Sequence, residues 1–168
     1  MLLSENCVKA VELLNDCGCL GYILPEIEYG FISQKTLHVL KAVAELTPDL
    51  CVRLSALLCD GDINIQSIMR RMMFHADEIR KVQFLVAHHD ACKDWGPLCE
   101  HLSDASLRRL QYQCGNIGFF EELLMLVHAQ NLTRNSGESW QNQSGLIYKR
   151  TLEMIGDGTA MFGFAPWL

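Results

Sequence analysis

The chain lacks the features that mark membrane, secreted and strand-rich proteins. No apolar run approaches the roughly 20 residues needed to cross a bilayer. Alternating runs of β-branched residues, which are typical of strands, are also missing. The first residues contain no basic segment followed by an apolar one, so we expect no signal peptide. These absences favour a helical protein in the cytoplasm, without a membrane partner.

Positive charge is scarce. The 168 residues include 14 Lys and Arg against 20 Asp and Glu, which gives a formal net charge of −6. Bulk charge therefore gives no support to nucleic-acid binding, and such a role would need a local basic patch. The hydrophobic fraction of 49% is typical of a globular protein, and the chain is long enough to bury a core.

Motifs for familiar catalytic chemistry are missing as well. The chain has no glycine-rich phosphate loop and no Gly-x-Ser-x-Gly elbow. Most of the eight cysteines fall at apolar positions of helical patterns, where a thiol behaves as a small hydrophobic group. Cys17-Gly18-Cys19 lacks the Cys-x-x-Cys spacing of redox pairs at a helix start, so the sequence does not favour a redox role.

What is present is a helical pattern along almost the whole chain. Thr47-Pro48-Asp49 predicts a helix start because it combines a cap, a proline and an acid in the first turn. Further starts are predicted near Ser4, Ser33, Ile63, His75, Ser103, Phe119 and residue 146. We therefore predict an all-α fold, a compact multi-helix bundle. Its first helical region covers residues 1–102 and a smaller C-terminal helical subdomain covers 103–168, unless the two form one continuous domain.

Four segments carry a family resemblance. Residues 12–26 combine a leucine-rich helix with Gly-Tyr-Ile-Leu-Pro-Glu, and residues 35–40 read Lys-Thr-Leu-His-Val-Leu. Residues 54–62 read Leu-Ser-Ala-Leu-Leu-Cys-Asp-Gly-Asp, and residues 69–88 form a basic helix pair ending in histidine. In this order the segments resemble the C-terminal half of CCA-adding tRNA nucleotidyltransferases and the related bacterial poly(A) polymerases.

The third segment also resembles the Ala-Leu-Leu-His-Asp segment of HD-type metal phosphohydrolase domains. Cys59 stands at the position of the metal-binding histidine, Asp60 is retained, and Lys35 replaces another histidine of the HD-bearing members. Because a lysine ammonium repels a cation, we expect a degenerate HD-like region with no metal site and no cofactor. A weak site at Asp60 and Asp62 stays an alternative, as does capping of the next helix by these residues.

Two other groups of residues are weaker candidates. His88 and Cys92 share a helix face, with Cys99 and His101 nearby, and zinc accepts such ligands, but the paired Cys-x-x-Cys arrangement is missing. The tail, residues 161–168, contains two phenylalanines and a tryptophan. Such side chains can stack on bases, although they more often pack on the protein's own core.

Three basic doublets are the candidate RNA-binding residues: Arg70, Arg71, Arg80, Lys81, Arg108 and Arg109. The resemblance implies that this helical region contacts tRNA through shape and phosphate rather than base sequence. The residues alone equally suit a solvated helix face with partners such as Asp77 for Lys81. We therefore predict RNA binding by these six side chains, with tRNA as the implied partner.

Catalysis by this chain is not expected. The resembling family transfers nucleotides with an N-terminal head that has a Gly-Ser strand motif and paired aspartates, and this chain has neither. The alternative to RNA binding is a degenerate HD-type domain that serves as a protein-interaction scaffold or forms a homo-oligomer. An active metal-dependent phosphohydrolase is the third and least favoured function.

Overall fold

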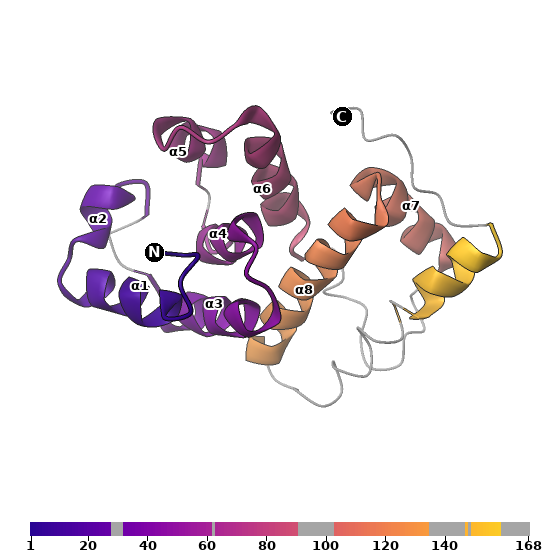
Figure 1. Cartoon of the computed structure of the whole chain (residues 1–168), viewed down its shortest axis with the longest axis horizontal. Coiled ribbons are helices and arrows are strands. Elements are labelled where there is room, and N and C mark those ends of the chain that lie inside the picture. Colours follow the sequence, from indigo (N-terminus) through magenta and orange to yellow (C-terminus); the bar gives the residue numbers. More distant parts are fainter. Residues whose placement is uncertain (28–31, 62, 91–102, 135–146, 148, 159–168) are drawn as a thin grey trace. The chain divides into compact units, whose positions relative to one another are not determined.

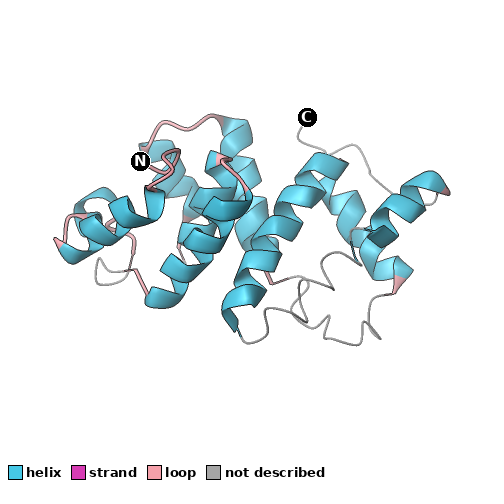
Figure 2. Cartoon of the chain, turned by 60° about the horizontal axis from the view of Figure 1, so that its bottom comes forward, coloured by secondary structure: helices cyan, strands magenta, loops and turns pink. Residues whose placement is uncertain are grey.

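The computed structural model describes residues 1–27, 32–61, 63–90, 103–134, 147 and 149–158 (Figure 1). Within these residues the regular structure is entirely helical, which confirms the all-α prediction (Figure 2). The chain divides into two compact units, Met1–His89 and Asp90–Leu168, which we call unit 1 and unit 2. The boundary predicted after residue 102 stays a prediction, because residues 91–102 lie outside the described ranges.

Unit 1 contains six of the labelled helices. They are α1 (Cys7–Asp16), α2 (Leu20–Ile23), α3 (Gln34–Leu46), α4 (Leu50–Leu58), α5 (Ile65–Arg71) and α6 (Ala76–His88). The Ser33 side chain begins α3 as predicted, because it accepts a hydrogen bond from the Thr36 N–H. The cap of α4 is Asp49, which accepts a hydrogen bond from the Val52 N–H, rather than the predicted Thr47. The one-turn helix α2 is not among the helices predicted from the sequence.

Helix α4 is the centre of unit 1. Its residues from Cys51 to Leu58 are all buried, and it packs against α3 on one side and α6 on another. A helix that is apolar around its whole circumference is stable only when neighbours cover every face. Val52, Ala56 and Leu58 are completely inaccessible to solvent. Burial of a side chain the size of leucine contributes about 1.5–3 kcal/mol, so α4 is the main apolar anchor of the unit.

Unit 2 contains α7 (Asp104–Cys114), α8 (Ile117–Arg134) and a shorter helical segment over residues 149–156. Ser103 caps α7 by accepting a hydrogen bond from the Ser106 N–H, as its position in the sequence predicts. Leu107 on α7 and Phe120 on α8 are completely buried. Among the described helices none is both long and apolar enough to cross a membrane.

Candidate functional site

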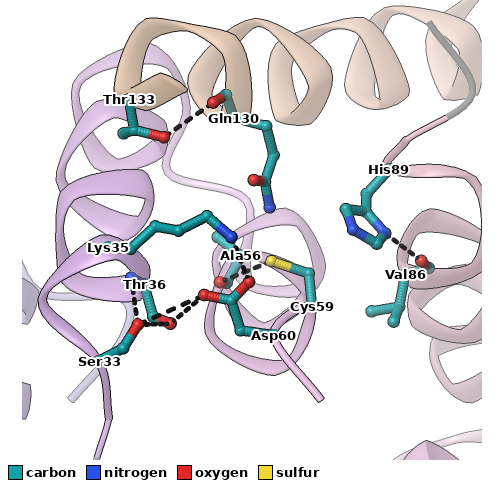
Figure 3. Close-up of polar contacts among 10 residues, drawn as sticks. All are labelled: Ser33, Lys35, Thr36, Ala56, Cys59, Asp60, Val86, His89, Gln130 and Thr133. Carbon is teal, nitrogen blue, oxygen red and sulfur yellow. Dashed lines mark hydrogen bonds and ion pairs between the residues drawn. The ribbon is translucent and has the colours of Figure 1, made fainter. Parts of the chain in front are cut away.

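The start of α3 and the end of α4 bring together Lys35 and Asp60, two residues of the predicted HD-like region. Lys35 Nζ lies 2.7 Å from Asp60 Oδ1, and the Thr36 hydroxyl donates to Asp60 Oδ2 at 2.8 Å (Figure 3). The Ser33 hydroxyl lies 3.4 Å from the same oxygen. Each carboxylate oxygen of Asp60 therefore has a donor from α3 or its cap. Residues that the sequence separates by about two dozen positions form one polar cluster.

The electrostatics of this cluster favour an ionised Asp60. Partial burial by itself would raise the pKa of the carboxyl group, but the hydrogen bonds from Lys35 and Thr36 outweigh burial and hold the pKa below its ordinary value. The Lys35 ammonium remains about half exposed, with a relative side-chain accessibility of 46%. Because solvent screens an ion pair of this kind, it orients the two helices more than it stabilises them.

The residues around Asp60 do not suit a divalent cation. The Lys35 ammonium already occupies the position facing Asp60 Oδ1, where it places a positive charge against the carboxylate. Cys59 is buried, and its thiol donates to the Ala56 carbonyl oxygen at 3.3 Å (Figure 3). Asp62 lies outside the described residues. Across the part of the chain that the structure describes, no three His, Cys, Asp or Glu side chains form a group able to hold a metal.

Two residues of the predicted RNA-binding set make ion pairs that join different elements of unit 1. The Arg71 guanidinium lies 2.8 Å from Glu26 Oε2 and also donates to the Ile23 carbonyl oxygen at 3.0 Å. Lys81 Nζ lies 3.1 Å from Asp49 Oδ2, the carboxylate that also caps α4. Arg71 therefore joins α5 to the end of α2, and Lys81 joins α6 to the start of α4.

Arg70 and Arg80 are exposed, as Arg71 is. Arg70 is exposed in the last turn of α5. Arg80 is exposed on α6, and its guanidinium lies 3.4 Å from Asp77, whose own side chain is 86% accessible. An exposed ion pair three residues apart on one helix contributes at most a few tenths of a kcal/mol, about the 0.3–0.5 kcal/mol of similar helix pairs.

The third doublet lies on α7 in unit 2. Arg109 is exposed, whereas Arg108 is partly covered, and its Nε is buried with no hydrogen-bond partner among the described residues. Asp104, at the start of the same helix, is bound by Arg150 at 2.8 Å. That hydrogen bond from Arg150, helped by the nearby charge of Arg108, lowers the pKa of Asp104. Arg109 is therefore the member of this doublet that is presented to solvent.

The remaining sequence candidates are only partly described. The His88 ring stacks on Phe84 with centroids 4.1 Å apart, and its Nδ1 lies 2.9 Å from the Phe84 carbonyl oxygen. His88 thus meets a carbonyl near the end of α6, where a histidine complements the helix dipole. Its proposed zinc partners Cys92, Cys99 and His101 lie outside the described residues, as does the aromatic tail.

Sequence reasoning missed Arg53. This side chain is only 5% accessible, yet its guanidinium reaches four backbone carbonyl oxygens. These belong to Leu2 (2.7 Å), Ser4 (3.1 Å), Ala44 (3.1 Å) and Thr47 (2.8 Å). Arg53 therefore ties the N-terminal segment and the end of α3 to α4. One feature of the sequence could have indicated the role of Arg53: it is the single charged residue of the apolar segment 50–58.

Comparison with known proteins adds no family to this description. The chain matches no protein-family model, no curated protein and no solved structure. The resemblance to the C-terminal half of CCA-adding enzymes accordingly rests on the four sequence segments alone.

Proposed function

We propose that this chain is a non-catalytic helical body that binds RNA through phosphate contacts, and that the RNA is a tRNA. The observation that carries the proposal is the exposure of three arginines: Arg70 and Arg80 in unit 1, and Arg109 in unit 2. The preference for RNA over other polyanions comes from the family resemblance. A cytoplasmic location belongs to the same proposal.

The contacts of the six predicted side chains divide them by role. Arg71 and Lys81 connect elements of unit 1 through Glu26 and Asp49, and moving them to a phosphate would break those connections. Arg70, Arg80 and Arg109 are exposed, and the ion pair described for Arg80 is with Asp77 of its own helix. A planar guanidinium can bind phosphate oxygens with two parallel hydrogen bonds. We assign phosphate binding to these three arginines and a structural role to Arg71 and Lys81; Arg108, which is partly covered, is assigned neither role.

The Asp60 cluster supports binding rather than hydrolysis. A metal-dependent phosphohydrolase needs carboxylates and imidazoles that are available to a cation. Here the carboxylate faces the Lys35 ammonium and the Thr36 hydroxyl, and Cys59 is buried against its own helix. In the proposal this cluster holds α3 against the end of α4, and it takes no part in chemistry.

Matched charge variants test the assignment. Arg70→Gln with Arg80→Gln should weaken binding of a labelled tRNA and reduce the salt slope of log K by about two, because each lost phosphate contact lowers the slope by about one. Lys9→Gln with Lys41→Gln removes the same charge from exposed positions on α1 and α3 and should leave both quantities nearly unchanged. Arg109→Gln and the exposed Lys149→Gln form the equivalent pair in unit 2.

Two results would remove the proposal. If the wild-type protein binds tRNA no better than an unrelated acidic protein, the RNA function is wrong. If the control variants weaken binding as much as the arginine variants do, the interaction is non-specific attraction and the assigned residues are wrong. Far-ultraviolet circular dichroism of each variant verifies that the helices are retained.

A self-association scaffold is the second candidate, and exposed apolar side chains favour it. Tyr22 and Met73 are 89% and 90% accessible. Each is within two residues of the contact between Arg71 and the Ile23 carbonyl, so both belong to the edge where α2 meets α5. If copies of the chain associate through this edge, light scattering should give a mass that rises with concentration, and Tyr22→Ser should abolish the rise. A monomer at all concentrations excludes this candidate.

A further inference from the structure

The two cysteines at the junction of α1 and α2 differ from the other described thiols. Cys17 is the residue at the C-terminal end of α1, Cys19 directly precedes α2, and both side chains are exposed. The remaining described cysteines are buried: Cys7, Cys51, Cys59 and Cys114. Burial raises the pKa of the Cys114 thiol to about 12, which makes it unreactive near neutral pH.

A fixed turn holds the exposed pair. The N–H groups of Cys17 and Gly18 donate to the Leu13 and Asn15 carbonyl oxygens at 3.0 and 3.1 Å. Gly18 has φ +71°, and a Cβ built on it would meet nothing within 4 Å, so glycine is needed there for its backbone conformation rather than for space. The Asn15 side chain anchors the turn by accepting a hydrogen bond from the Ile32 N–H at 2.7 Å.

The two thiols interact unequally. A side-chain hydrogen bond from Cys19 lowers the pKa of the Cys17 thiol, and the same interaction raises the pKa of Cys19. The negative charge of Asp16 acts in the opposite direction on Cys17 but is the smallest of the contributions. A thiolate is the attacking species in exchange with disulfides. Cys17 is thus the better nucleophile, and Cys19 is the adjacent thiol that can resolve a mixed disulfide.

We propose that Cys17 and Cys19 form a thiol–disulfide exchange site for low-molecular-weight disulfides of the glutathione type. The Cys17 thiolate attacks one sulfur of the disulfide, which forms a mixed disulfide and expels one small thiolate. Cys19 then loses its proton and attacks Cys17 Sγ, which closes the Cys17–Cys19 bond and expels the second small thiolate. The two protons released by the cysteines protonate the two leaving thiolates, so one small disulfide is reduced to two thiols as the pair is oxidised.

The short spacing and the exposure decide how stable this disulfide is. Exposed or strained disulfides are more oxidising than structural ones and are reduced easily. A single residue separates the two cysteines, and both are exposed. The Cys17 thiol donates to the Leu14 carbonyl oxygen at 3.6 Å. The pair should therefore respond reversibly to the ratio of oxidised to reduced glutathione rather than form a permanent cross-link. The sequence disfavours a redox role because the usual spacing is absent, and the exposed turn is what the structure adds.

Equilibration of the whole protein in glutathione buffers tests the site. The protein used carries Cys92→Ser and Cys99→Ser, which removes the two thiols outside the described residues. Peptide mapping by mass spectrometry should find a Cys17–Cys19 disulfide that is lost again when reduced glutathione is added. Cys19→Ser should instead accumulate a mixed disulfide with glutathione at Cys17, and Cys17→Ser should accumulate little of it at Cys19.

Three results would overturn the proposal: a pair that stays reduced even in fully oxidised glutathione, a disulfide that reduced glutathione fails to open, or equal trapping at Cys17 and Cys19 in the two serine variants. None of these bears on RNA binding, because the tRNA titration is made with reduced protein. Circular dichroism verifies that the serine variants retain their helices, which is expected because both side chains are exposed.

Discussion

Replacement of Arg53 by methionine should destabilise unit 1 more than any surface substitution. The Arg53 guanidinium is the shared donor for four carbonyl oxygens, in the N-terminal segment, at the end of α3 and in the cap of α3. Methionine keeps much of the apolar length of the side chain but has no donor. The substitution therefore removes the hydrogen bonds while limiting the cavity that is left.

The magnitude follows from two opposing terms. A hydrogen bond that involves a charged group contributes about 1.5–3 kcal/mol, and the four bonds are not additive because they share one guanidinium. Burial of that guanidinium at 5% accessibility costs several kcal/mol, and the variant escapes this cost. The Leu2 and Ser4 carbonyls can turn to water, whereas Ala44 and Thr47 are held at the end of α3. We expect a net loss of about 3 kcal/mol, because a buried carbonyl left without a donor costs about 1–3 kcal/mol and two of the carbonyls are held in place.

Urea unfolding followed by circular dichroism measures this loss. Arg53→Met is compared with Arg70→Met, an exposed arginine on α5 for which a change within about 0.5 kcal/mol is expected. Arg53→Lys should fall between the two, because one ammonium cannot reach all four carbonyls. An Arg53→Met variant as stable as Arg70→Met would refute the reasoning, since it would mean that the carbonyls find other partners without loss.

Three further predictions concern single positions. Met73 has φ +61° at the C-terminal turn of α5, so Met73→Gly should raise the free energy of unfolding by about 1 kcal/mol in urea titration. The lowered pKa of Asp60 means that its contribution to stability is present above the pKa of the unfolded state and is lost as the pH falls through the lower folded value. In Lys35→Met the free energy of unfolding should therefore fall less than in the wild-type protein between neutral pH and about pH 3. The lowered pKa of Cys17 predicts alkylation by iodoacetamide that begins at lower pH than alkylation of Cys19, and equal profiles would contradict it.

The sequence predicts the elements of this fold better than their contacts. Helix starts at Ser33, Asp49 and Ser103 are local, because the capping side chain and the N–H it binds are three residues apart. The first helix begins at Cys7 rather than near Ser4. The Ser4 carbonyl accepts a hydrogen bond from Arg53, which is 49 residues further along the chain. A contact over this separation cannot be predicted from a local sequence pattern.

The difference between local features and contacts of distant residues also explains what could be predicted of the candidate site. The charges of Arg71 and Lys81 are visible in the sequence, but their carboxylate partners lie 45 and 32 residues away. The sequence therefore presents a doublet such as Arg70-Arg71 as two equivalent charges. In the fold both side chains are exposed, but Arg71 is bound to Glu26. The structure also places Lys35 and Asp60, which are 25 residues apart in the sequence, in contact.

The salt dependence of tRNA binding tests the central claim most directly. The affinity of the unmodified, reduced protein for a labelled tRNA is measured between low and physiological salt. Three arginine–phosphate contacts predict that log K falls linearly with log salt, with a slope of about −2 to −3. Binding that is undetectable at low salt, or a slope near zero, would contradict the account.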